Sequence, residues 1–210
     1  MADLEAIKDA LLAGDQVQLL ERIQTSLDSG TGAEEILNDG LIKAMDIVGE
    51  RMKNSQMFIP EVLRCAKVMN AAVEALKPLL GEKGAARAGK FVIGTVKGDL
   101  HDIGKNLFKM MLESSGFEVA DLGVDVAPDA FVTAIRESGA PIVGLSALLT
   151  TTMPMMKETV DTITGAGLRD QVKIIVGGAP ITQKFADEIG ADGYGPDAGS
   201  GTKLAKQLIS

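Results

Sequence analysis

The stretch FVIGTVKGDLHDIGKN, residues 91–106, decides how the second half of the chain is interpreted. Its opening run, from Phe91 to Val96, shows no polar alternation, which predicts a strand buried on both faces of a parallel sheet. The residues from Asn106 to Leu112 predict a helix. His101 is therefore expected in a loop at the carboxyl end of a strand, where open α/β sheets bind their ligands.

His101 is the only histidine of the chain. An imidazole can titrate or bind a metal. Asp99 lies two residues earlier, and in an extended segment its carboxylate points the same way as the ring, fixing the tautomer and making the other nitrogen a better metal donor. Gly104 lets the backbone approach a bulky group. The alternative is a surface turn with a solvated histidine, and these residues alone leave both interpretations open.

Strand-like and helix-like segments alternate after Lys90, which predicts parallel βαβ units and a flavodoxin-like or Rossmann-like fold of the α/β class. The expected strands cover residues 91–96, 117–122, 141–146, 173–177 and 192–194. The expected helices cover residues 104–115, 128–138, 153–166, 181–189 and 197–208.

The first 80 residues show helical periodicity and predict a small antiparallel four-helix bundle. Each expected helix carries one apolar stripe. In chain order, the stripes are Leu4, Ile7 and Leu11 for the first helix; Val17, Leu20, Ile23 and Leu27 for the second; Ile36 or Leu37, Leu41, Met45, Val48 and Met52 for the third; and Val62, Ala66, Met69, Val73 and Leu76 for the fourth. Asp15 is expected to cap the second helix and Pro60 to lie in the first turn of the fourth. The small and polar segment 81–90 predicts a linker. The expected domains are residues 1–88 and 89–210.

The composition excludes several functions. The net charge of −8 argues against binding to nucleic acid, whose phosphates attract a basic surface. A single cysteine, Cys65, permits no internal disulfide and suits a reducing cytoplasm. The acidic start does not resemble a signal peptide, and no apolar run approaches the about 18 residues of a membrane span. One histidine and one cysteine cannot build an ordinary zinc site, so a metal on His101 is expected to arrive in a macrocycle that supplies most of its ligands.

Other segments have both a structural and a functional interpretation. The hydroxyls of Ser146–Thr152 can bind a buried polar ligand or cap a helix. Gly177 and Gly178 allow a ligand to lie against the backbone, or form an ordinary tight turn. Met57–Ile59, just before Pro60, can be a hydrophobic staple, and Tyr194 can be a packed edge residue. The residues themselves do not decide between these interpretations.

Three ordered motifs resemble the cobalamin-binding domain of the methionine synthase class. They are D-x-H-x-x-G (Asp99, His101, Gly104), S-x-L (Ser146 to Leu148) and the paired glycines Gly177-Gly178. The resemblance extends over roughly the whole chain, including the helical first half. It implies an N-terminal helical cap followed by a Rossmann-like, five-stranded domain that binds cobalamin or a related corrinoid.

The resemblance also implies roles for individual residues. His101 is the expected cobalt ligand, Asp99 its partner, and Thr152 stands where methionine synthases have a serine that completes a triad. Ser146 and Thr150 match positions beside the nucleotide tail of the cofactor, Gly177 and Gly178 line its tunnel, and Tyr194 touches it. The remaining expected contacts are Gly98, Asp102, Ile103, Gly104 and Leu148, with Phe58 over the exposed face of the corrin and Val62, Cys65 and Met69 as further cap candidates.

No segment suggests a (β/α)8 barrel, which needs about 250 residues. The resemblance therefore implies a corrinoid carrier that is not a complete enzyme alone and shuttles a methyl group via Co(I) and methyl-Co(III). Its expected partners are a donor-specific methyltransferase, an acceptor methyltransferase that uses tetrahydrofolate or coenzyme M, and a reductive activase. The alternatives are the cobalamin subunit of a radical mutase, a cobalamin-dependent sensor, and a flavodoxin-like domain for an unrelated ligand.

Overall fold

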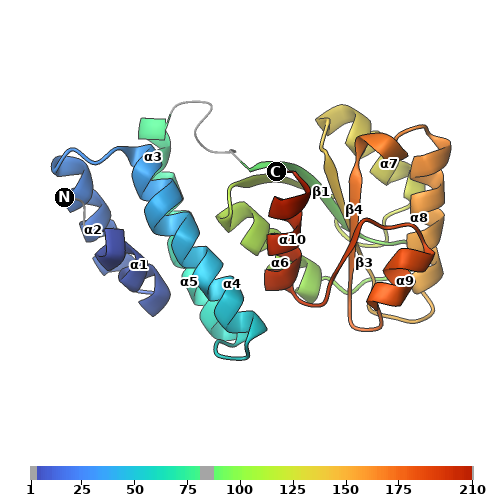
Figure 1. The fold of residues 1–210 in the computed structure, drawn as a ribbon, viewed down its shortest axis with the longest axis horizontal. Helices are drawn as coiled ribbons and strands as arrows, with labels where there is room; N and C mark the ends of the chain where they lie inside the picture. The colour runs from blue at the N-terminus through green and yellow to red at the C-terminus, as the bar shows by residue number, and fades with distance from the viewer. Residues whose placement is uncertain (1–3, 81–87, 210) are drawn as a thin grey trace. The chain divides into compact units, whose positions relative to one another are not determined.

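The computed structural model describes residues 4–80 and 88–209 (Figure 1). These residues form two compact units: a helical unit of residues 4–80 with 114–116, and a sheet unit of residues 88–113 with 117–209. The predicted linker lies, apart from residues 88–90, outside the described residues. Within the described ranges, no helix is long and apolar enough to cross a membrane.

The helical unit contains the predicted helices. Its elements are α1 (Leu4–Ala13), α2 (Gln16–Asp28), α3 (Ala33–Glu35), the π-helix η1 (Ile36–Ile42), α4 (Lys43–Lys53) and α5 (Ile59–Leu80). The predicted third helix is thus α3, η1 and α4 in direct succession. Asp15 caps α2 as predicted, since its carboxylate accepts from the backbone N–H of Gln18 at 2.9 Å.

One predicted stripe is wrong at its first residue, Val17, although its Ile23 is buried as predicted. Val17 of α2 is 70% exposed, whereas the buried side of this helix consists of Leu19, Ile23 and Ser26. Apolar residues occur on more than one side of α2, and the side that packs against α1 and α5 is the one that carries Leu19 and Ile23.

Helix α5 begins with a cap made by its own first turn. The carboxylate of Glu61 accepts from the backbone N–H of Phe58 at 2.9 Å, which is one half of a capping box. Met57, before this cap, and Val62, after it, are both buried, whereas the Phe58 side chain is 67% exposed.

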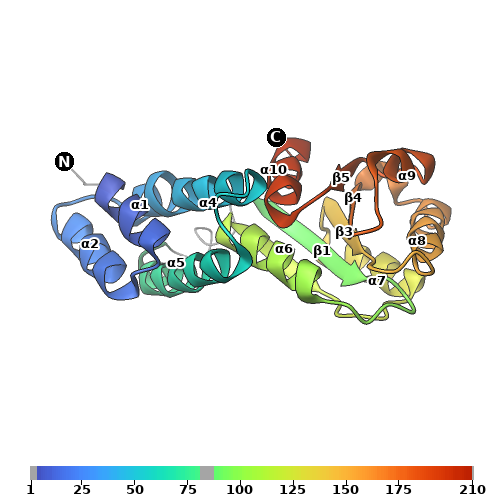
Figure 2. The ribbon, with the colours of Figure 1, turned by 90° about the horizontal axis from the view of Figure 1, so that it is seen from below.

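The sheet unit has five parallel strands in the order β2-β1-β3-β4-β5. Figure 2 labels β1, β3, β4 and β5 of this sheet. The strands are β1 (Gly89–Thr95), β2 (Phe117–Asp121), β3 (Ile142–Ser146), β4 (Lys173–Gly177) and β5 (Gly193–Gly195). The helices are α6 (Ile103–Ser114), α7 (Pro128–Ser138), α8 (Met153–Gly165), α9 (Gln183–Glu188) and α10 (Ala198–Leu208), with a short 3₁₀ turn η2 (Arg169–Gln171). The predicted α/β fold class is confirmed, and each predicted strand lies within two residues of an observed one.

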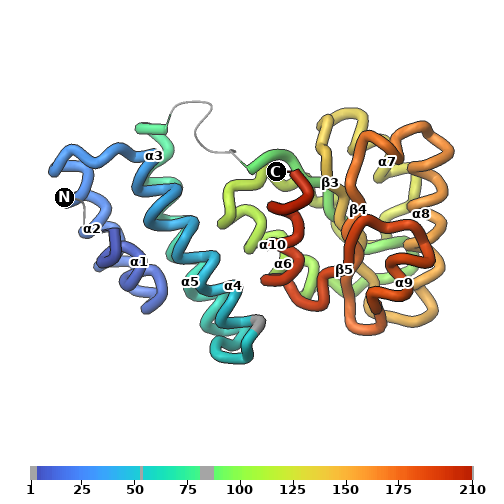
Figure 3. Tube along the Cα trace, viewed as in Figure 1, coloured from blue at the N-terminus to red at the C-terminus, as the bar shows by residue number. Residues whose placement is uncertain are grey.

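Alternate residues of the strands enter two separate cores. Phe91, Ile142 and Ile175 pack with side chains of α6 and α10, whereas Val92, Val143 and Ile174 pack with side chains of α7, α8 and α9. The two sets of helices therefore cover opposite faces of the sheet, as the trace in Figure 3 shows. Burial on both faces explains why these strands are apolar without alternation.

The order of the strands reverses between β1 and β3. The chain leaves β1 into α6 on one face and leaves β3 into α8 on the other, while Thr95 and Ser146 are paired neighbours at the carboxyl ends of these strands. Such a switch point leaves a crevice at the carboxyl edge of the sheet. The loops that follow β1 and β3 both begin at this point.

Candidate functional site

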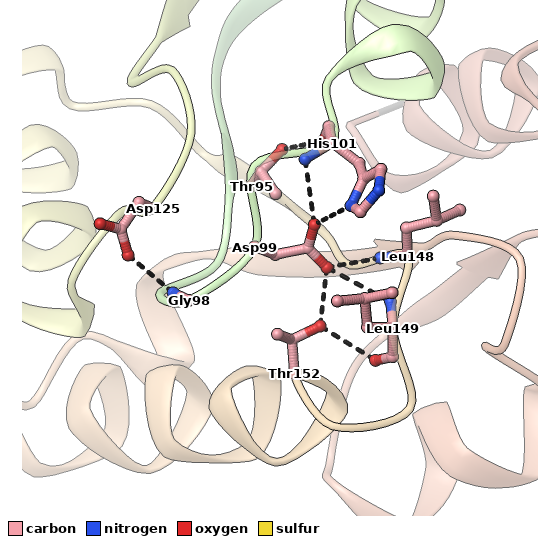
Figure 4. A network of polar contacts seen from close by, with 8 residues as sticks. All are labelled: Thr95, Gly98, Asp99, His101, Asp125, Leu148, Leu149 and Thr152. Atoms are coloured by element: carbon pink, nitrogen blue, oxygen red, sulfur yellow. Dashed lines mark hydrogen bonds and ion pairs between the residues drawn. The ribbon is translucent and has the colours of Figure 1, made fainter.

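The carboxylate of Asp99 lies at the centre of a polar network between these two loops (Figure 4). Asp99 is fully buried. Its Oδ1 accepts from the backbone N–H of His101 at 3.0 Å and from Nδ1 of the same residue at 2.8 Å. The predicted pairing of Asp99 with the ring of His101 is therefore present in the structure.

The second oxygen of Asp99 binds the loop that follows β3. Oδ2 accepts from the backbone N–H of Leu148 at 2.7 Å, from that of Leu149 at 3.3 Å and from the Thr152 hydroxyl at 2.7 Å. One carboxylate thus joins the β1–α6 loop to the β3–α8 loop.

These donors determine the charge of Asp99. Burial by itself would raise the pKa of its carboxyl, but the hydrogen bonds from Thr152, Leu148 and His101 hold this pKa well below the ordinary value. Asp99 is therefore an anion at neutral pH, and an anionic carboxylate can only accept. The proton between Asp99 and His101 belongs to Nδ1, which leaves Nε2 as the ring nitrogen for a further ligand.

His101 is held at its backbone as well as at its ring. The hydroxyl of the fully buried Thr95, the last residue of β1, donates to the His101 carbonyl at 3.0 Å. The His101 side chain itself is 49% exposed. An accessible imidazole in a fixed orientation and tautomer is the arrangement that a metal-binding histidine needs.

A cavity of about 560 Å³ adjoins His101. Every residue that lines it belongs to the sheet unit. The lining comes from β1, β3, β4 and β5, from α6 and α10, and from the loops that follow the strands. The predicted site residues among them are His101, Asp102, Ile103, Gly104, Ser146, Leu148, Gly177 and Gly178.

The other predicted site residues lie elsewhere. Gly98, Asp99 and Thr152 belong to the polar network, and Thr150 is exposed. Tyr194 is half-buried against the core under α7, α8 and α9. In the helical unit, Phe58 is exposed, whereas the further cap candidates Val62, Cys65 and Met69 are buried, and the Cys65 thiol lies 3.6 Å from the Leu12 carbonyl.

The glycines that line the cavity differ in what a side chain at each position would contact. A Cβ on Gly178, whose φ is +135°, would lie 1.8 Å from the Ala147 carbonyl oxygen, so the protein's own backbone requires glycine there. A Cβ on Gly177 would lie 3.1 Å from the Gly195 carbonyl oxygen. At Gly104, by contrast, a Cβ would meet no protein atom within 4 Å. Gly178 therefore fits the tight-turn interpretation, while Gly104 leaves open space on the cavity side of α6.

The sequence interpretation missed a buried ion pair beside the site. Nζ of Lys105 lies 2.7 Å and 2.8 Å from the two carboxylate oxygens of Asp121 at the end of β2, and the Lys105 side chain is only 2% exposed. Lys105 lines the cavity and directly follows Gly104. Its place next to this glycine could have predicted that it lies at the site. Asp125, whose carboxylate accepts from the Gly98 N–H in the site loop, was missed as well.

The site fits a metal-centred group that brings most of its own ligands. It offers one oriented imidazole, a cavity beside it, and a rim of large apolar side chains, of which Leu100 is 71% and Ile103 77% exposed. Within the part of the chain that the structure describes, no group of three or more His, Cys, Asp or Glu side chains is arranged to hold a metal ion. A flat macrocycle with a polar tail matches this combination of one donor, apolar rim and cavity.

A histidine fixed by a buried carboxylate at the switch point of a parallel sheet defines a ligand-binding α/β protein of the cofactor-carrying class. Comparison with known families specifies the cofactor. A family model described as "B12 binding domain" matches residues 89–201, and a second model of the same description matches residues 3–77. The chain belongs to the B12-binding domain family.

Named relatives agree with this assignment. The chain is 39% identical to a corrinoid protein of Desulfitobacterium hafniense over 100% of this chain and 98% of that protein. It is 43% identical to dimethylamine corrinoid protein 1 of Methanosarcina acetivorans over 97% of this chain and 92% of that protein.

Solved structures are similar over the same extent. A cobalamin-binding protein of Desulfitobacterium hafniense matches with a TM-score of 0.87 at 35% identity over 100% of both chains. The methanol:cobalamin methyltransferase complex of Methanosarcina barkeri matches with a TM-score of 0.85 at 28% identity over 98% of this chain and 79% of that one. The predicted family and the predicted corrinoid cofactor are confirmed.

Proposed function

We propose that the chain is the corrinoid carrier of a cytoplasmic methyltransferase system and that it binds its cofactor with His101 as the lower cobalt ligand and the cofactor's own base displaced. The observation that carries the proposal is the His101–Asp99 pair, in which a buried anionic carboxylate holds the proton at Nδ1 and leaves Nε2 for the metal. A bound corrinoid supplies a cobalt that accepts a methyl group as Co(I) and gives it up from methyl-Co(III).

The residues of the chain have separate tasks in this proposal. Asp99 sets how strongly the imidazole of His101 donates, and Thr152 limits the negative charge that Asp99 presents to the ring. The cavity holds the displaced nucleotide tail, with Ser146, Gly177 and Gly178 in its wall. Phe58 of the helical unit is the candidate that shields the reactive face from water.

The names of the similar proteins support a methyltransferase as partner. One similar structure is a complex with a methanol:cobalamin methyltransferase, and several similar proteins are named corrinoid proteins for dimethylamine or trimethylamine. We therefore expect a donor-specific methyltransferase of the methanol or methylamine type, an acceptor methyltransferase that uses tetrahydrofolate or coenzyme M, and a reductive activase. The acidic net charge of −8 makes nucleic acid an unfavourable partner.

The test of the ligand uses the fact that the chain has a single histidine. The protein is produced with ¹⁵N-labelled histidine, reconstituted with hydroxocobalamin, separated by gel filtration and reduced to Co(II). We expect coloured protein whose paramagnetic resonance shows nitrogen coupling as doublets, instead of the triplets of the unlabelled protein, and His101→Ala should lose this coupling. Triplets that persist in the labelled protein would show the cofactor's own base on cobalt, and a colourless protein would overturn corrinoid binding.

The carrier role has its own test. Reduced holoprotein is mixed with methanol, dimethylamine or trimethylamine and the corresponding methyltransferase, and methylation of the cobalt is followed by absorption. We expect methylation with one matching enzyme and donor. A protein that binds the corrinoid but is methylated in none of the mixtures would favour a sensor over a carrier.

A further inference from the structure

The loop that follows β2 runs along the loop that carries Asp99 and His101. The backbone N–H of Thr95 donates to the Gly123 carbonyl at 3.0 Å, and that of Val126 donates to the Thr95 carbonyl at 3.0 Å. Val96 and Val126 form a parallel bridge beyond the ends of the strands. The sheet pairing of β1 with β2 is thereby extended up to the site.

Asp125 in this loop binds the site loop on both sides of a peptide unit. Its Oδ1 accepts from the backbone N–H of Gly98 at 2.7 Å (Figure 4). Its own backbone N–H donates to the Asp99 carbonyl at 3.0 Å. These two contacts hold the backbone of Gly98 and of Asp99, and the position of this backbone determines where the Asp99 side chain lies.

This arrangement requires an unusual backbone at Asp125. Its φ is +53°, and among the described residues only Ser55 is another non-glycine with positive φ. Aspartate and asparagine tolerate this left-handed region better than most residues, so the position combines a side-chain acceptor with a conformation that few residues adopt. An exposed residue in this conformation, bonded twice to the site loop, indicates a specific task.

The two oxygens of the Asp99 carboxylate accept hydrogen bonds from two different loops at the same time. Its Oδ1 contacts His101, while its Oδ2 contacts Thr152 and the β3–α8 loop. A shift of the Asp99 backbone would open one of these contacts. Thr95 fixes the site loop at His101, and Asp125 fixes it at Gly98 and Asp99.

We propose that Asp125 is a positioning residue for the cobalt-binding histidine: it sets the backbone of Asp99 so that the carboxylate keeps the proton of His101 on Nδ1. The proposal rests on the function assigned to His101 above, but it concerns the protein before any cofactor is bound. Two substitutions separate the contacts. Asp125→Gly keeps the backbone N–H and favours positive φ but removes the acceptor, whereas Asp125→Asn keeps the acceptor and tolerates the same φ.

The test is the tautomer of His101 in the apoprotein with ¹⁵N-labelled histidine. At about pH 9, above the ordinary pKa of imidazole, the two ring nitrogen shifts report which nitrogen carries the proton. We expect the Nδ1–H form in the wild type, in Asp125→Asn and in the control Asp129→Ala, which removes a nearby exposed carboxylate. In Asp125→Gly the ratio of Nδ1–H to Nε2–H should fall about tenfold, as expected when a displaced Asp99 carboxylate loses its hydrogen bond with Nδ1–H.

The outcomes are distinguishable. An unchanged tautomer in Asp125→Gly, with cooperative urea unfolding that shows a folded variant, would overturn the role of Asp125. An equal change in Asp125→Asn would overturn it as well, because asparagine keeps the acceptor. A wild-type ring in the Nε2–H form would instead contradict the Asp99–His101 pairing on which the proposed function rests.

Discussion

The Thr152 hydroxyl donates to Oδ2 of Asp99 over 2.7 Å, on the oxygen opposite to the one that holds the His101 ring. The same hydroxyl lies 2.9 Å from the Leu149 carbonyl, but it has one proton, and the charged carboxylate is the stronger acceptor. Threonine at this position therefore supplies the contact that the resemblance assigns to a serine, and its methyl group does not prevent it.

Replacement of Thr152 by valine should destabilise the sheet unit, because it removes a donor from a buried anion. The expected loss is about 1–3 kcal/mol in the free energy of unfolding, whereas Thr152→Ser should stay within about 1 kcal/mol of the wild type. The measurement is urea unfolding of the apoprotein followed by tyrosine fluorescence. Tyr194 is the only tyrosine and there is no tryptophan, so the signal reports the sheet unit alone. Equal stability of the valine and serine variants would contradict this role of the hydroxyl.

The two glycine positions at the cavity should respond differently to alanine. Gly178→Ala places a Cβ against the Ala147 carbonyl at a φ of +135°, so we expect a loss of more than about 2 kcal/mol in the same unfolding measurement. Gly104→Ala should leave the apoprotein as stable as the wild type, because its Cβ meets open space. Retention of hydroxocobalamin on gel filtration then shows whether the cofactor lies against Gly104. Bound cofactor that is unaffected by the added methyl group would refute that contact.

The Lys105–Asp121 pair should make the sheet unit sensitive to acid. Burial by itself would raise the pKa of the Asp121 carboxyl, but the hydrogen bonds from Lys105 and the Gly123 N–H and the charge of Lys105 lower it below the ordinary value. A carboxyl whose pKa is lowered by folding contributes stability that is present above the unfolded pKa of about 4 and is lost as the pH falls through the folded pKa.

Asp121→Asn should therefore reduce the loss of stability below about pH 4, measured as the free energy of urea unfolding against pH. Asp161→Asn is the matched control, because Asp161 forms an exposed pair with Lys157 that contributes little. Lys105→Met should destabilise at neutral pH by about 1–3 kcal/mol, because it removes two hydrogen bonds to the Asp121 carboxylate and leaves only Lys109, at 3.3 Å, as its cation. Identical pH profiles for both asparagine variants would exclude Asp121 as a source of the acid sensitivity.

The proposed role of Phe58 in covering the corrin can be tested against Val17, an equally exposed apolar residue of the helical unit. Phe58 and Val17 are 67% and 70% exposed, so alanine at either position should leave the thermal unfolding of the apoprotein unchanged. If Phe58 shields the corrin, only Phe58→Ala should accelerate the aerobic reoxidation of bound, reduced cobalamin. Equal rates for both variants would remove Phe58 from the cap.

Strands β1, β3 and β4 were predictable because burial on both faces leaves an uninterrupted apolar run, as in Ile174–Val176. The buried side of α2 was not, since apolar residues on several sides of a helix do not reveal which one its neighbours cover. The Asp99–His101 pair was predictable from spacing within one segment. The contacts of Asp125 with Gly98 and of Lys105 with Asp121 depend on which strands are neighbours in the sheet. The donors at Leu148 and Leu149 are backbone N–H groups, and the pattern of side chains in a sequence does not predict their contacts.

Because one carboxylate takes its donors from two loops that lie far apart in the chain, those loops form a single structural unit. A chimera that replaces residues 147–152 would keep the backbone donors at positions 148 and 149, but it could lose the hydroxyl at position 152. Such an exchange should therefore preserve the Asp99 network only where position 152 keeps a serine or threonine.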